Sequence, residues 1–324
     1  MSRRALITGV AGQDGSYLSE LLLDKGYAVF GISGPAPLDL LSDVKARGGD
    51  RFRLIPSDLT DADSLVSAVE EARPDEIYNL AAVSGVGDSW GQVLSSTDVN
   101  AFGVLRLLEA ARRVCPSARI LETASAEVFG RSIRVPQDEG GALDPGSPYG
   151  AAKAYALMIG RVYREAYGVF CANALLFNHE SPRRETTVVT RKITDAAARI
   201  SLGLADSVAL GNLDARRDWG FAGDYVKAMW AMLQQEKPDD FVIATGVAHS
   251  VREFCEAAFA HVGLGYRDHV TVDERFMRPA DVEIMVGDAS KARSALGWEP
   301  SVDFAGLVGM MVDADLERLR GARA

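Results

Sequence analysis

The chain opens with ALITGVAGQDG, residues 5–15, and this stretch decides the fold class. A short apolar run typical of a buried strand leads into glycines at positions 9, 12 and 15, where a helix is predicted to begin. Glycine permits a tight turn and lets a pyrophosphate approach backbone N–H groups at a helix N-terminus. The position between a strand and a helix favours a dinucleotide site over a merely structural turn. The cofactor contacts predicted here are Gly9, Gly12, Gln13, Asp14 and Gly15.

Outward from this stretch, short apolar runs alternate with amphipathic segments, the pattern of a parallel sheet with crossover helices. The predicted strands are 5–8, 28–32, 53–56, 76–80, 119–124 and 170–176. The predicted helices are 16–25, 61–72, 100–114 and 149–167. Beyond about Asn178 the elements become shorter and are set with arginines and prolines, which predicts a second lobe over the carboxyl edge of the sheet.

The predicted fold class is therefore α/β, a Rossmann-type doubly wound parallel sheet with a smaller, mostly helical substrate-binding lobe. Residues 1–176 are expected to form the NAD(P)-binding domain, with 217–248 returning to it. Residues 177–216 and 249–324 are expected to form the lobe.

Composition argues against several classes of protein. The 324 residues are 48% hydrophobic and 25% charged, as in globular domains, and the net charge of −10 disfavours nucleic acid as a partner. No stretch reaches the roughly 18 apolar residues that a membrane helix needs. Cys115, Cys171 and Cys255 have no metal-ligand spacing and are interpreted as structural thiols of a reducing compartment. The first residues resemble a signal peptide only until the glycines and Asp14, so a cytoplasmic location is expected. No metal site is predicted.

The segments that would meet the adenosine and the nicotinamide leave alternatives open. The second predicted strand ends in Ile32–Pro35, which carries neither the carboxylate that suits NAD nor the arginine that suits NADP. Asp58 and Leu59 could bracket the adenine, although a helix N-cap explains Asp58 equally well. Leu80, Ala81 and Ala82 suit a small-residue wall beside the cofactor, and simple close packing is the alternative.

A tyrosine and a lysine four residues apart form the first part of a catalytic group. Tyr149 and Lys153 share one face of a predicted helix, where the ammonium favours the phenolate form of the tyrosine. Ser125 follows a predicted strand at the carboxyl edge of the sheet and would bind the same sugar oxygen as Tyr149. Glu127, two residues further on, is either a solvated loop residue or a base that removes a proton next to a new ketone. The spacing by itself favours neither interpretation of Glu127.

Several longer segments resemble GDP-mannose 4,6-dehydratases, a nucleotide-sugar branch of the extended short-chain dehydrogenase/reductase family. The matching segments are ALITG at 5–9, GQDGSYL at 12–18, PDEIYNLAA at 74–82, LFNHESPRR at 176–184, VTRKI at 189–193, RDWG at 217–220, DFVIATG at 240–246 and RPADVE at 278–283. They occur in order over nearly the whole chain, and the NHESPRR segment is especially specific.

The resemblance implies a role for residues at matching positions. Ser125 stands where the family has its catalytic threonine, Glu127 at its acid/base glutamate, Tyr149 at its base and Lys153 at its lysine. The further cofactor contacts implied are Ser84, His179 and Arg184. The implied contacts to the GDP-sugar are Ser84, Asn178, Val189, Lys192, Arg217, Arg278 and Glu283.

The reaction implied is that of a hydro-lyase, which converts GDP-mannose or a close GDP-hexose to GDP-4-keto-6-deoxy-mannose with a tightly bound NADP. A homodimer through helices 100–114 and 149–167 is also expected. A GDP-sugar 4-reductase or 4-epimerase is the alternative reaction, and a catalytically silent dinucleotide-binding scaffold is the remote one.

Three departures from the family pattern bear on these expectations. The arginine-rich stretch after the second strand, which contacts the 2′-phosphate and supports tetramers, reads SGPAP at 33–37. This keeps NAD open as the cofactor and argues against a tetramer. Val83–Gly85 replaces Gln-Ser-His, so sugar contacts differ, and Ser125–Glu127 replaces Thr-Ser-Glu but keeps the acting groups.

Overall fold

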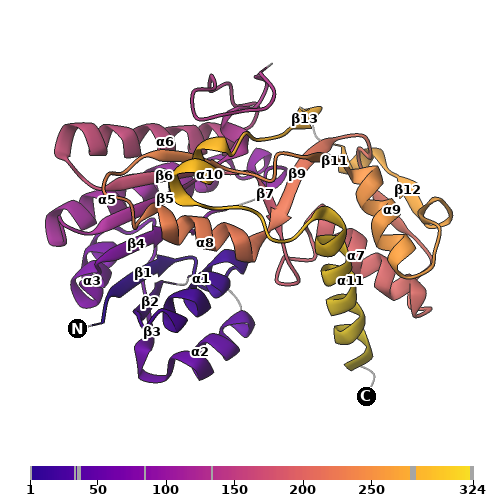
Figure 1. Ribbon diagram of the computed structural model, residues 1–324, viewed down its shortest axis with the longest axis horizontal. Helices are drawn as coiled ribbons and strands as arrows, with labels where there is room; N and C mark the ends of the chain where they lie inside the picture. Colours follow the sequence, from indigo (N-terminus) through magenta and orange to yellow (C-terminus); the bar gives the residue numbers. More distant parts are fainter. Residues whose placement is uncertain are drawn as a thin grey trace.

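The computed structural model describes residues 2–32, 34, 38–83, 85–132, 134–277 and 282–321. Within these ranges seven parallel strands form a central sheet in the order β10-β6-β5-β4-β1-β2-β3 (Figure 1). They are β1 (Arg4–Thr8), β2 (Ala28–Ile32), β3 (Phe52–Ile55), β4 (Glu76–Asn79), β5 (Arg119–Ser125), β6 (Cys171–Leu176) and β10 (Asp240–Ile243). The strand order reverses between β1 and β4, and such a switch point opens a ligand crevice at the carboxyl ends of the strands. The sheet is therefore the doubly wound, Rossmann-type sheet predicted from the sequence.

Helices cover both faces of this sheet. One layer holds α3 (Ala62–Ala72), α5 (Gly103–Val114) and α6 (Pro148–Tyr167), and the other holds α1 (Gln13–Asp24), α2 (Ser42–Gly48) and α8 (Ala222–Met232). Because successive strand residues point to opposite faces, Leu6 of β1 packs into the first layer and Ile7 into the second. Both side chains are fully buried. The apolar strand sequences thus reflect burial on two faces.

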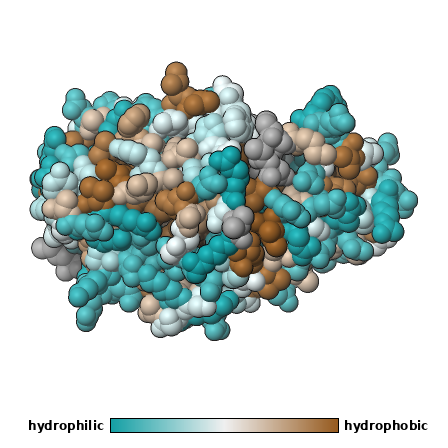
Figure 2. All heavy atoms as spheres, turned by 90° about the horizontal axis from the view of Figure 1, so that it is seen from above, coloured by the Kyte–Doolittle hydropathy of each residue, from teal (hydrophilic) through white to brown (hydrophobic). Residues whose placement is uncertain are grey.

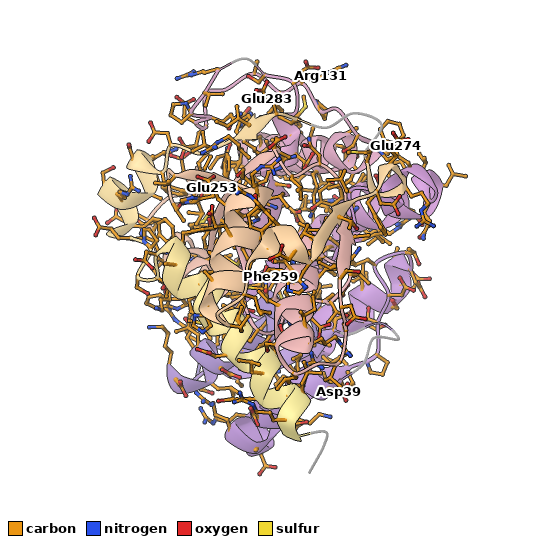
Figure 3. The ribbon with its side chains drawn as sticks, turned by 90° about the vertical axis from the view of Figure 1, so that its right-hand side faces the viewer. Asp39, Arg131, Glu253, Phe259, Glu274 and Glu283 are labelled. Carbon is orange, nitrogen blue, oxygen red and sulfur yellow. The ribbon has the colours of Figure 1, made fainter. Side chains whose placement is uncertain are left out.

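The lobe lies at one end of the sheet, on the right in Figure 1, and ends in the C-terminal helix. Its helices are α7 (Val189–Ser201), α9 (Val251–His261) and α11 (Phe304–Gly321). They enclose a core in which the rings of Trp219 and Phe254 meet edge to face, 5.2 Å apart. Figure 3 looks onto this lobe and labels Phe259, another buried member of the same core.

Short strands complete the lobe. β8 (Val208–Leu210) pairs with β12 (Val270–Val272), while β9 (Arg216–Phe221) pairs with β7 (Asn178–Glu180), β11 (Ala248–Ser250) and β13 (Ile284–Met285). β7 directly follows β6 of the main sheet, so the chain passes from sheet to lobe at the carboxyl edge, where the predicted site residues gather.

Two later segments return to the main sheet. α8 packs on α1, β10 extends the sheet beside β6, and α10 (Ser290–Leu296) packs on β10 and α8. β9, which begins at Arg216 and covers the start of 217–248, belongs instead to the sheet of the lobe. The domain bounds given above remain a prediction, and these contacts show where the chain crosses between the two sheets.

Two predicted helices differ in their bounds from the observed ones, and the strands of the lobe were not predicted. α1 begins at Gln13 rather than at 16, because the third glycine already lies inside the helix. The helix expected over 100–114 is divided into a π-helical turn (Asp98–Phe102) and α5, and the short α4 (Val93–Thr97) precedes it. The strands of the lobe have two to six residues. Most are too short to show a period in the sequence.

The described residues contain no membrane-spanning helix, no metal-binding group and no disulfide. No helix among them has the length and apolar character needed to cross a membrane. They contain no group of three or more His, Cys, Asp or Glu side chains arranged to hold a metal ion. Cys115, Cys171 and Cys255 are unpaired, and burial raises the pKa of the Cys255 thiol to about 12, which keeps that thiol neutral.

Candidate active site

The glycine-rich turn after β1 leaves no room for side chains. Gly9 has a φ of +66°, and a Cβ there would lie 2.8 Å from the backbone of Ala81. A Cβ on Gly15 would lie 2.4 Å from the carbonyl oxygen of Gly9, which accepts a hydrogen bond from the N–H of Gly12 at 3.0 Å. No described side chain caps α1 at Gly12. The turn therefore offers backbone N–H groups at a helix N-terminus, the arrangement that a pyrophosphate requires.

Asp14, in the first turn of α1, is paired with His179 of β7. Nε2 of His179 lies 2.8 Å from Oδ2 of Asp14, while Nδ1 lies 2.7 Å from the carbonyl oxygen of Phe177. The imidazole also stacks on the ring of Tyr225, with centroids 4.6 Å apart. Burial disfavours the charged form of each partner, yet their mutual attraction lowers the pKa of Asp14 and raises that of His179. These two predicted cofactor contacts thus form one partly buried ion pair.

Gln13 joins the same two segments through its amide. Its Nε2 donates to the carbonyl oxygen of His179 at 3.1 Å, and its Oε1 accepts from the hydroxyl of Ser181 at 2.8 Å. Arg183 adds an ion pair to Glu20 of α1 at 2.7 Å. The side chain of Gln13 is thus engaged with the segment after β6, and this segment is fixed against the first turn of α1.

The tyrosine and lysine predicted to be catalytic lie where β5 ends and α6 begins. Ser147 accepts a hydrogen bond from the N–H of Gly150 at 3.0 Å and caps α6, with Pro148 in the first turn. Tyr149 and Lys153 follow on one face, and both are buried. Nζ of Lys153 donates to the carbonyl oxygen of Thr123 in β5 at 2.7 Å. This bond joins the helix of the tyrosine to the strand that leads to Ser125.

Ser125 and Glu127 lie on the turn that follows β5. Ser125 ends the strand and its Oγ accepts from the N–H of Glu127 at 3.2 Å, which begins a 3₁₀ turn over Ala126–Val128. A Cβ on Gly150 would lie 2.6 Å from the carbonyl oxygen of Glu127, so this turn and the start of α6 are in direct contact. The structure thus brings the four predicted catalytic residues to one junction of β5 and α6.

Arg184 connects this group to the cofactor turn. Its Nε lies 3.1 Å from Oε2 of Glu180, although without hydrogen-bond geometry. The carboxylate of Glu180 raises the pKa of the guanidinium against the opposing effect of burial, and Asp14 and Tyr149 act in the same direction. Arg184 therefore lies within electrostatic reach of both Asp14 and Tyr149.

The predicted small-residue wall is held by β1. The N–H groups of Leu80 and Ala81 both donate to Oγ1 of Thr8 at 3.1 Å, and the hydroxyl of Thr8 donates to Oδ1 of Asn79 at 2.6 Å. Asn79 in turn donates to the buried carboxyl of Glu122. Sequence reasoning missed Thr8, Asn79 and Glu122. The signal that could have revealed them is a charged residue inside an otherwise apolar strand at 119–124.

Asp58 and Leu59 do not share one environment. The exposed Asp58 accepts hydrogen bonds from the N–H and hydroxyl of Thr60, which lower the pKa of its carboxyl. Asp61, and not Asp58, caps α3. Leu59 is buried against Gly103. The helix-cap alternative for Asp58 is therefore wrong, and the turn it stabilises precedes α3.

The predicted substrate residues of the lobe occupy several elements. Asn178 begins β7 and Val189 begins α7. Nζ of Lys192 on α7 lies 3.7 Å from the ring centre of Phe276, and burial lowers the pKa of this ammonium. The buried Arg217 of β9 donates to the carbonyl oxygen of Val282 at 2.8 Å.

Glu283 lies next to Val282 and is exposed at the upper part of the lobe in Figure 3. Its carbonyl oxygen accepts from the N–H of Arg216 at 2.9 Å. Arg217 and Glu283 thus share one corner of the lobe, while Lys192 lies on another helix. Two further predicted contacts, Ser84 and Arg278, fall outside the described residues, as does most of the 33–37 segment.

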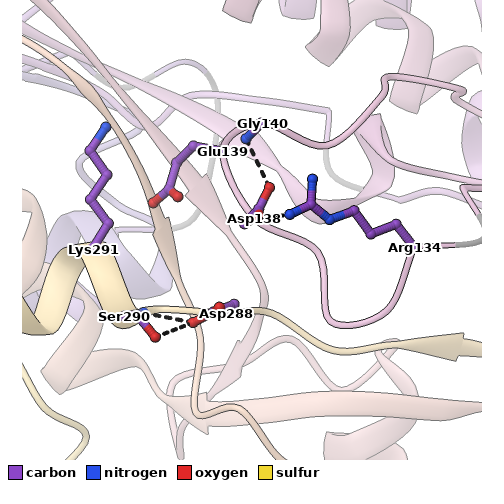
Figure 4. Close-up of a pocket in the computed structure, with 7 residues that line it drawn as sticks. All are labelled: Arg134, Asp138, Glu139, Gly140, Asp288, Ser290 and Lys291. Atoms are coloured by element: carbon purple, nitrogen blue, oxygen red, sulfur yellow. Dashed lines mark hydrogen bonds and ion pairs between the residues drawn. The ribbon is translucent and has the colours of Figure 1, made fainter.

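A surface hollow of about 360 Å³ is lined by none of the residues at the junction of β5 and α6 (Figure 4). It is lined by Arg134, Asp138, Glu139, Gly140, Asp288, Ser290 and Lys291. Its charged groups are engaged with the protein: Arg134 pairs with Asp138, Lys291 with Asp239 at 2.7 Å, and Glu139 accepts from the N–H of Val242 at 2.7 Å. None of the predicted site residues lines it, and we assign it no function.

Comparison with known proteins shows which family the chain belongs to. The family model of GDP-mannose 4,6 dehydratase matches residues 6–311. GDP-mannose 4,6 dehydratase 2 of Arabidopsis thaliana is 50% identical, with 97% of this chain and 87% of that protein covered. GDP-mannose 4,6 dehydratase of Homo sapiens is 45% identical, with 98% and 92% covered.

Among solved structures, the UDP-glucose 4-epimerase of Thermus thermophilus in complex with NAD has a similar fold. The TM-score is 0.84 at 26% identity, with 98% of this chain and 99% of that chain covered. The catalytic junction, the glycine turn and the match over nearly the whole length lead to one conclusion. The chain belongs to the GDP-mannose 4,6-dehydratase family.

Proposed function

We propose that this protein is a hydro-lyase that converts GDP-mannose to GDP-4-keto-6-deoxy-mannose with a nicotinamide cofactor that stays bound. Family membership supports the substrate and the reaction. The observation that carries the catalytic assignment is the direct contact between the turn of Glu127 and the helix of Tyr149 and Lys153. A simple oxidoreductase of this fold needs the hydroxyl, the phenol and the lysine. A carboxylate beside them supplies the acid/base group that an elimination requires.

The residues around the glycine turn fit a dinucleotide. At Gly9 and Gly15 any side chain would clash with neighbouring backbone, so glycine keeps the turn tight, and the N-terminus of α1 has no side-chain cap. Lys153 and Tyr149 would hold the nicotinamide end of the dinucleotide. Arg184 would hold the part between that end and the glycine turn. A nicotinamide held there would supply hydride exchange with the hexose, between its C4 and C6 positions.

The protein residues carry the proton transfers. Tyr149, as phenolate, takes the proton of the C4 hydroxyl, while Ser125 holds the same oxygen and Lys153 favours the phenolate. The ketone formed at C4 acidifies the C5 hydrogen, which the carboxylate of Glu127 removes. The protonated Glu127 then donates to the C6 hydroxyl, which leaves as water, and the proton that Tyr149 took from the C4 hydroxyl is delivered to C5, which restores the phenolate. The site must exclude solvent while the unsaturated sugar is present.

For the finer identity of the cofactor we propose NADP, as the family resemblance implies, with NAD as the alternative because the 33–37 segment has no arginine. Mass analysis of the nucleotide that copurifies with the protein separates the two. We propose that the lobe binds the GDP moiety. Arg217 and Arg278 would bind the diphosphate, and Glu283 would accept hydrogen bonds from the guanine. The residues around the nucleotide and sugar would be Lys192, Asn178, Val189 and Ser84. Guanidinium groups suit a diphosphate because they form bidentate, charge-assisted bonds.

A homodimer is proposed through α6 and the segments beside it. Met158 and Val162 of α6 are 55% and 50% exposed, and Phe102 of the neighbouring π-helical turn is 47% exposed. The ring of Phe102 also meets that of Tyr155 on α6. Residues 155, 158 and 162 share one helical face. Figure 2 looks onto the side of the molecule where α6 lies and shows apolar side chains at the surface among polar ones. A second copy of this chain would cover them.

The direct test is incubation of the purified protein with GDP-mannose and no added reductant. A product lighter by one water supports the proposal. Consumption of added NADPH with a GDP-keto-sugar would instead support a 4-reductase, an isomer of unchanged mass would support a 4-epimerase, and no turnover of any GDP-hexose would support a silent protein.

A further inference from the structure

A buried carboxyl group lies beneath the catalytic lysine. Glu122 is in the middle of β5 with 1% of its surface exposed, and its register partners are Asn79 on β4 and Asn173 on β6. Placing a carboxylate inside a parallel sheet is costly unless specific partners hold it. Glu122 is not one of the four residues that the proposed reaction uses, so its presence there calls for an explanation.

The two oxygens of Glu122 are in different surroundings. Oε2 accepts a hydrogen bond from Nδ2 of Asn79 at 2.6 Å. Oε1 lies 4.0 Å from Nζ of Lys153 and has no hydrogen-bond partner among the described residues. Lys153 meanwhile donates to the carbonyl oxygen of Thr123. The ammonium and Oε1 are thus close enough to interact by charge but are not bonded.

The orientation of Asn79 is fixed from its other side. The hydroxyl of Thr8 accepts from two backbone N–H groups, so it donates its own proton to Oδ1 of Asn79. The amide of Asn79 must therefore present its NH₂ group to Glu122. Glu122 accepts at Oε2 in either protonation state, and Oε1 is left as the position that can gain or lose a proton.

The surroundings allow both states of this carboxyl near neutral pH. Burial raises the pKa of Glu122 to about 7, against the opposing effects of Lys153 and Asn79. Cys171 of β6 also faces it, and burial raises the pKa of that thiol above its usual range, so it carries no charge. Asn173 donates to Asp240 and adds no charge of its own.

We propose that Glu122 is a positioning residue that sets how strongly Lys153 favours the phenolate form of Tyr149. With Glu122 neutral, the field of the ammonium at the phenol is undiminished. With Glu122 ionised, the carboxylate cancels part of that field, and the phenolate is less favoured. This inference rests on the proposed function for its catalytic consequence, whereas the coupling between the three groups is a property of the protein alone.

The first test follows the ionisation of Tyr149 directly. Protein labelled with ¹³C at the oxygen-bearing ring carbon of tyrosine is titrated by NMR, and Tyr149→Phe assigns the signal. In the wild type the Tyr149 curve should show a second inflection where Glu122 titrates. In Glu122→Gln, which keeps the shape and an acceptor for Asn79, that inflection should disappear. The phenol should then ionise at a lower pH, because the negative charge of Glu122 no longer opposes the ammonium of Lys153.

A matched control comes from Glu139→Gln, since Glu139 is another partly buried carboxyl of elevated pKa, bonded to the N–H of Val242. This control should leave the Tyr149 curve unchanged. Identical Tyr149 curves for wild type and Glu122→Gln would overturn the proposal. A single inflection in the wild type would overturn it as well, and this reading does not require Glu122→Gln to fold.

The second test uses the pH profile of GDP-mannose dehydration, whose acidic limb should move to lower pH in Glu122→Gln and stay in place in Glu139→Gln. An unmoved limb in Glu122→Gln contradicts the coupling. If the wild type releases no water from GDP-mannose, the proposed function fails, and the NMR titration still decides the role of Glu122.

Discussion

Nε2 of His179 lies 2.8 Å from Oδ2 of Asp14, and this contact joins residues 165 positions apart in the chain. It ties the first turn of α1, where the cofactor is expected, to β7, where the chain enters the substrate lobe. One ion pair thus connects the two halves of the proposed site.

The pair predicts a pH-dependent stability. The pKa of His179 is raised, so its contribution is fully present below about pH 6.5 and is lost as the pH rises through the folded-state value. The pKa of Asp14 is lowered, so its contribution is present above about pH 4 and is lost at lower pH. Asp14→Asn should therefore reduce the free energy of unfolding by about 1–3 kcal/mol at pH 6 and by less at pH 9.5. Urea unfolding at the two pH values measures this.

Asp24→Asn is the control for that measurement, because Asp24 pairs with Arg47 on the surface and should contribute less than about 1 kcal/mol. An equal loss for Asp14→Asn at both pH values would show that the imidazole and the carboxylate are not coupled as the structure indicates.

Glu127 is predicted to carry the elimination. Glu127→Gln keeps the size of the side chain but removes the base, so dehydration should slow by a factor on the order of 10²–10⁴. Oxidation at C4 needs Tyr149 rather than Glu127, so reduced nicotinamide should accumulate and absorb near 340 nm. The control Glu236→Gln changes an exposed residue far from the catalytic junction in sequence and should behave as wild type. Normal release of water by Glu127→Gln would remove this carboxyl from the mechanism.

A buried ion pair in the lobe should fix the segment that carries Arg184. The fully buried Asp315 of α11 accepts from Arg191, which also donates to the carbonyl oxygens of Pro182 and Arg184. Asp315→Asn leaves a buried guanidinium without its counter-ion and should destabilise the protein by about 3–5 kcal/mol. The KM for GDP-mannose should rise as the segment loosens.

Asp313 lies on the same helix but is exposed and pairs with His261, so Asp313→Asn should change neither quantity appreciably. Thermal unfolding and steady-state kinetics on both variants distinguish the two positions. Equal behaviour of the two variants would contradict the structural role of Asp315.

The apolar face of α6 predicts the oligomeric state. Met158→Glu combined with Val162→Glu places two charges on the proposed dimer face and should convert a dimer to a monomer in light scattering. Val247→Glu changes an equally exposed valine outside α6 and should leave the dimer intact. A monomeric wild type, or a double variant that remains a dimer, would refute the assignment of this face.

Six of the seven strands of the main sheet could be predicted from the sequence, because each is a short run rich in apolar residues and bounded by turn signals. The seventh, β10, was not predicted as a strand. The junction of β5 and α6 followed from the same reasoning, since Ser125 ends a predicted strand and Tyr149 begins a predicted helix. Parallel strands bring such ends to one edge.

The contacts of Glu122 could not be predicted in this way. They depend on the register that sets it beside Asn79 and on the turn of α6 that brings Lys153 above it. Neither the register nor the helix rotation is encoded in local periodicity. The strands of the lobe were not predicted for a related reason, because their pairing arises from tertiary packing.

The most direct test of the proposed function uses GDP-mannose that carries deuterium at C4, with the purified protein and no added cofactor. The label should appear at C6 of GDP-4-keto-6-deoxy-mannose, since the hydride removed from C4 is returned within the same active site. Deuterium lost to solvent, retained at C4, or transferred to added nicotinamide would contradict the proposed dehydration.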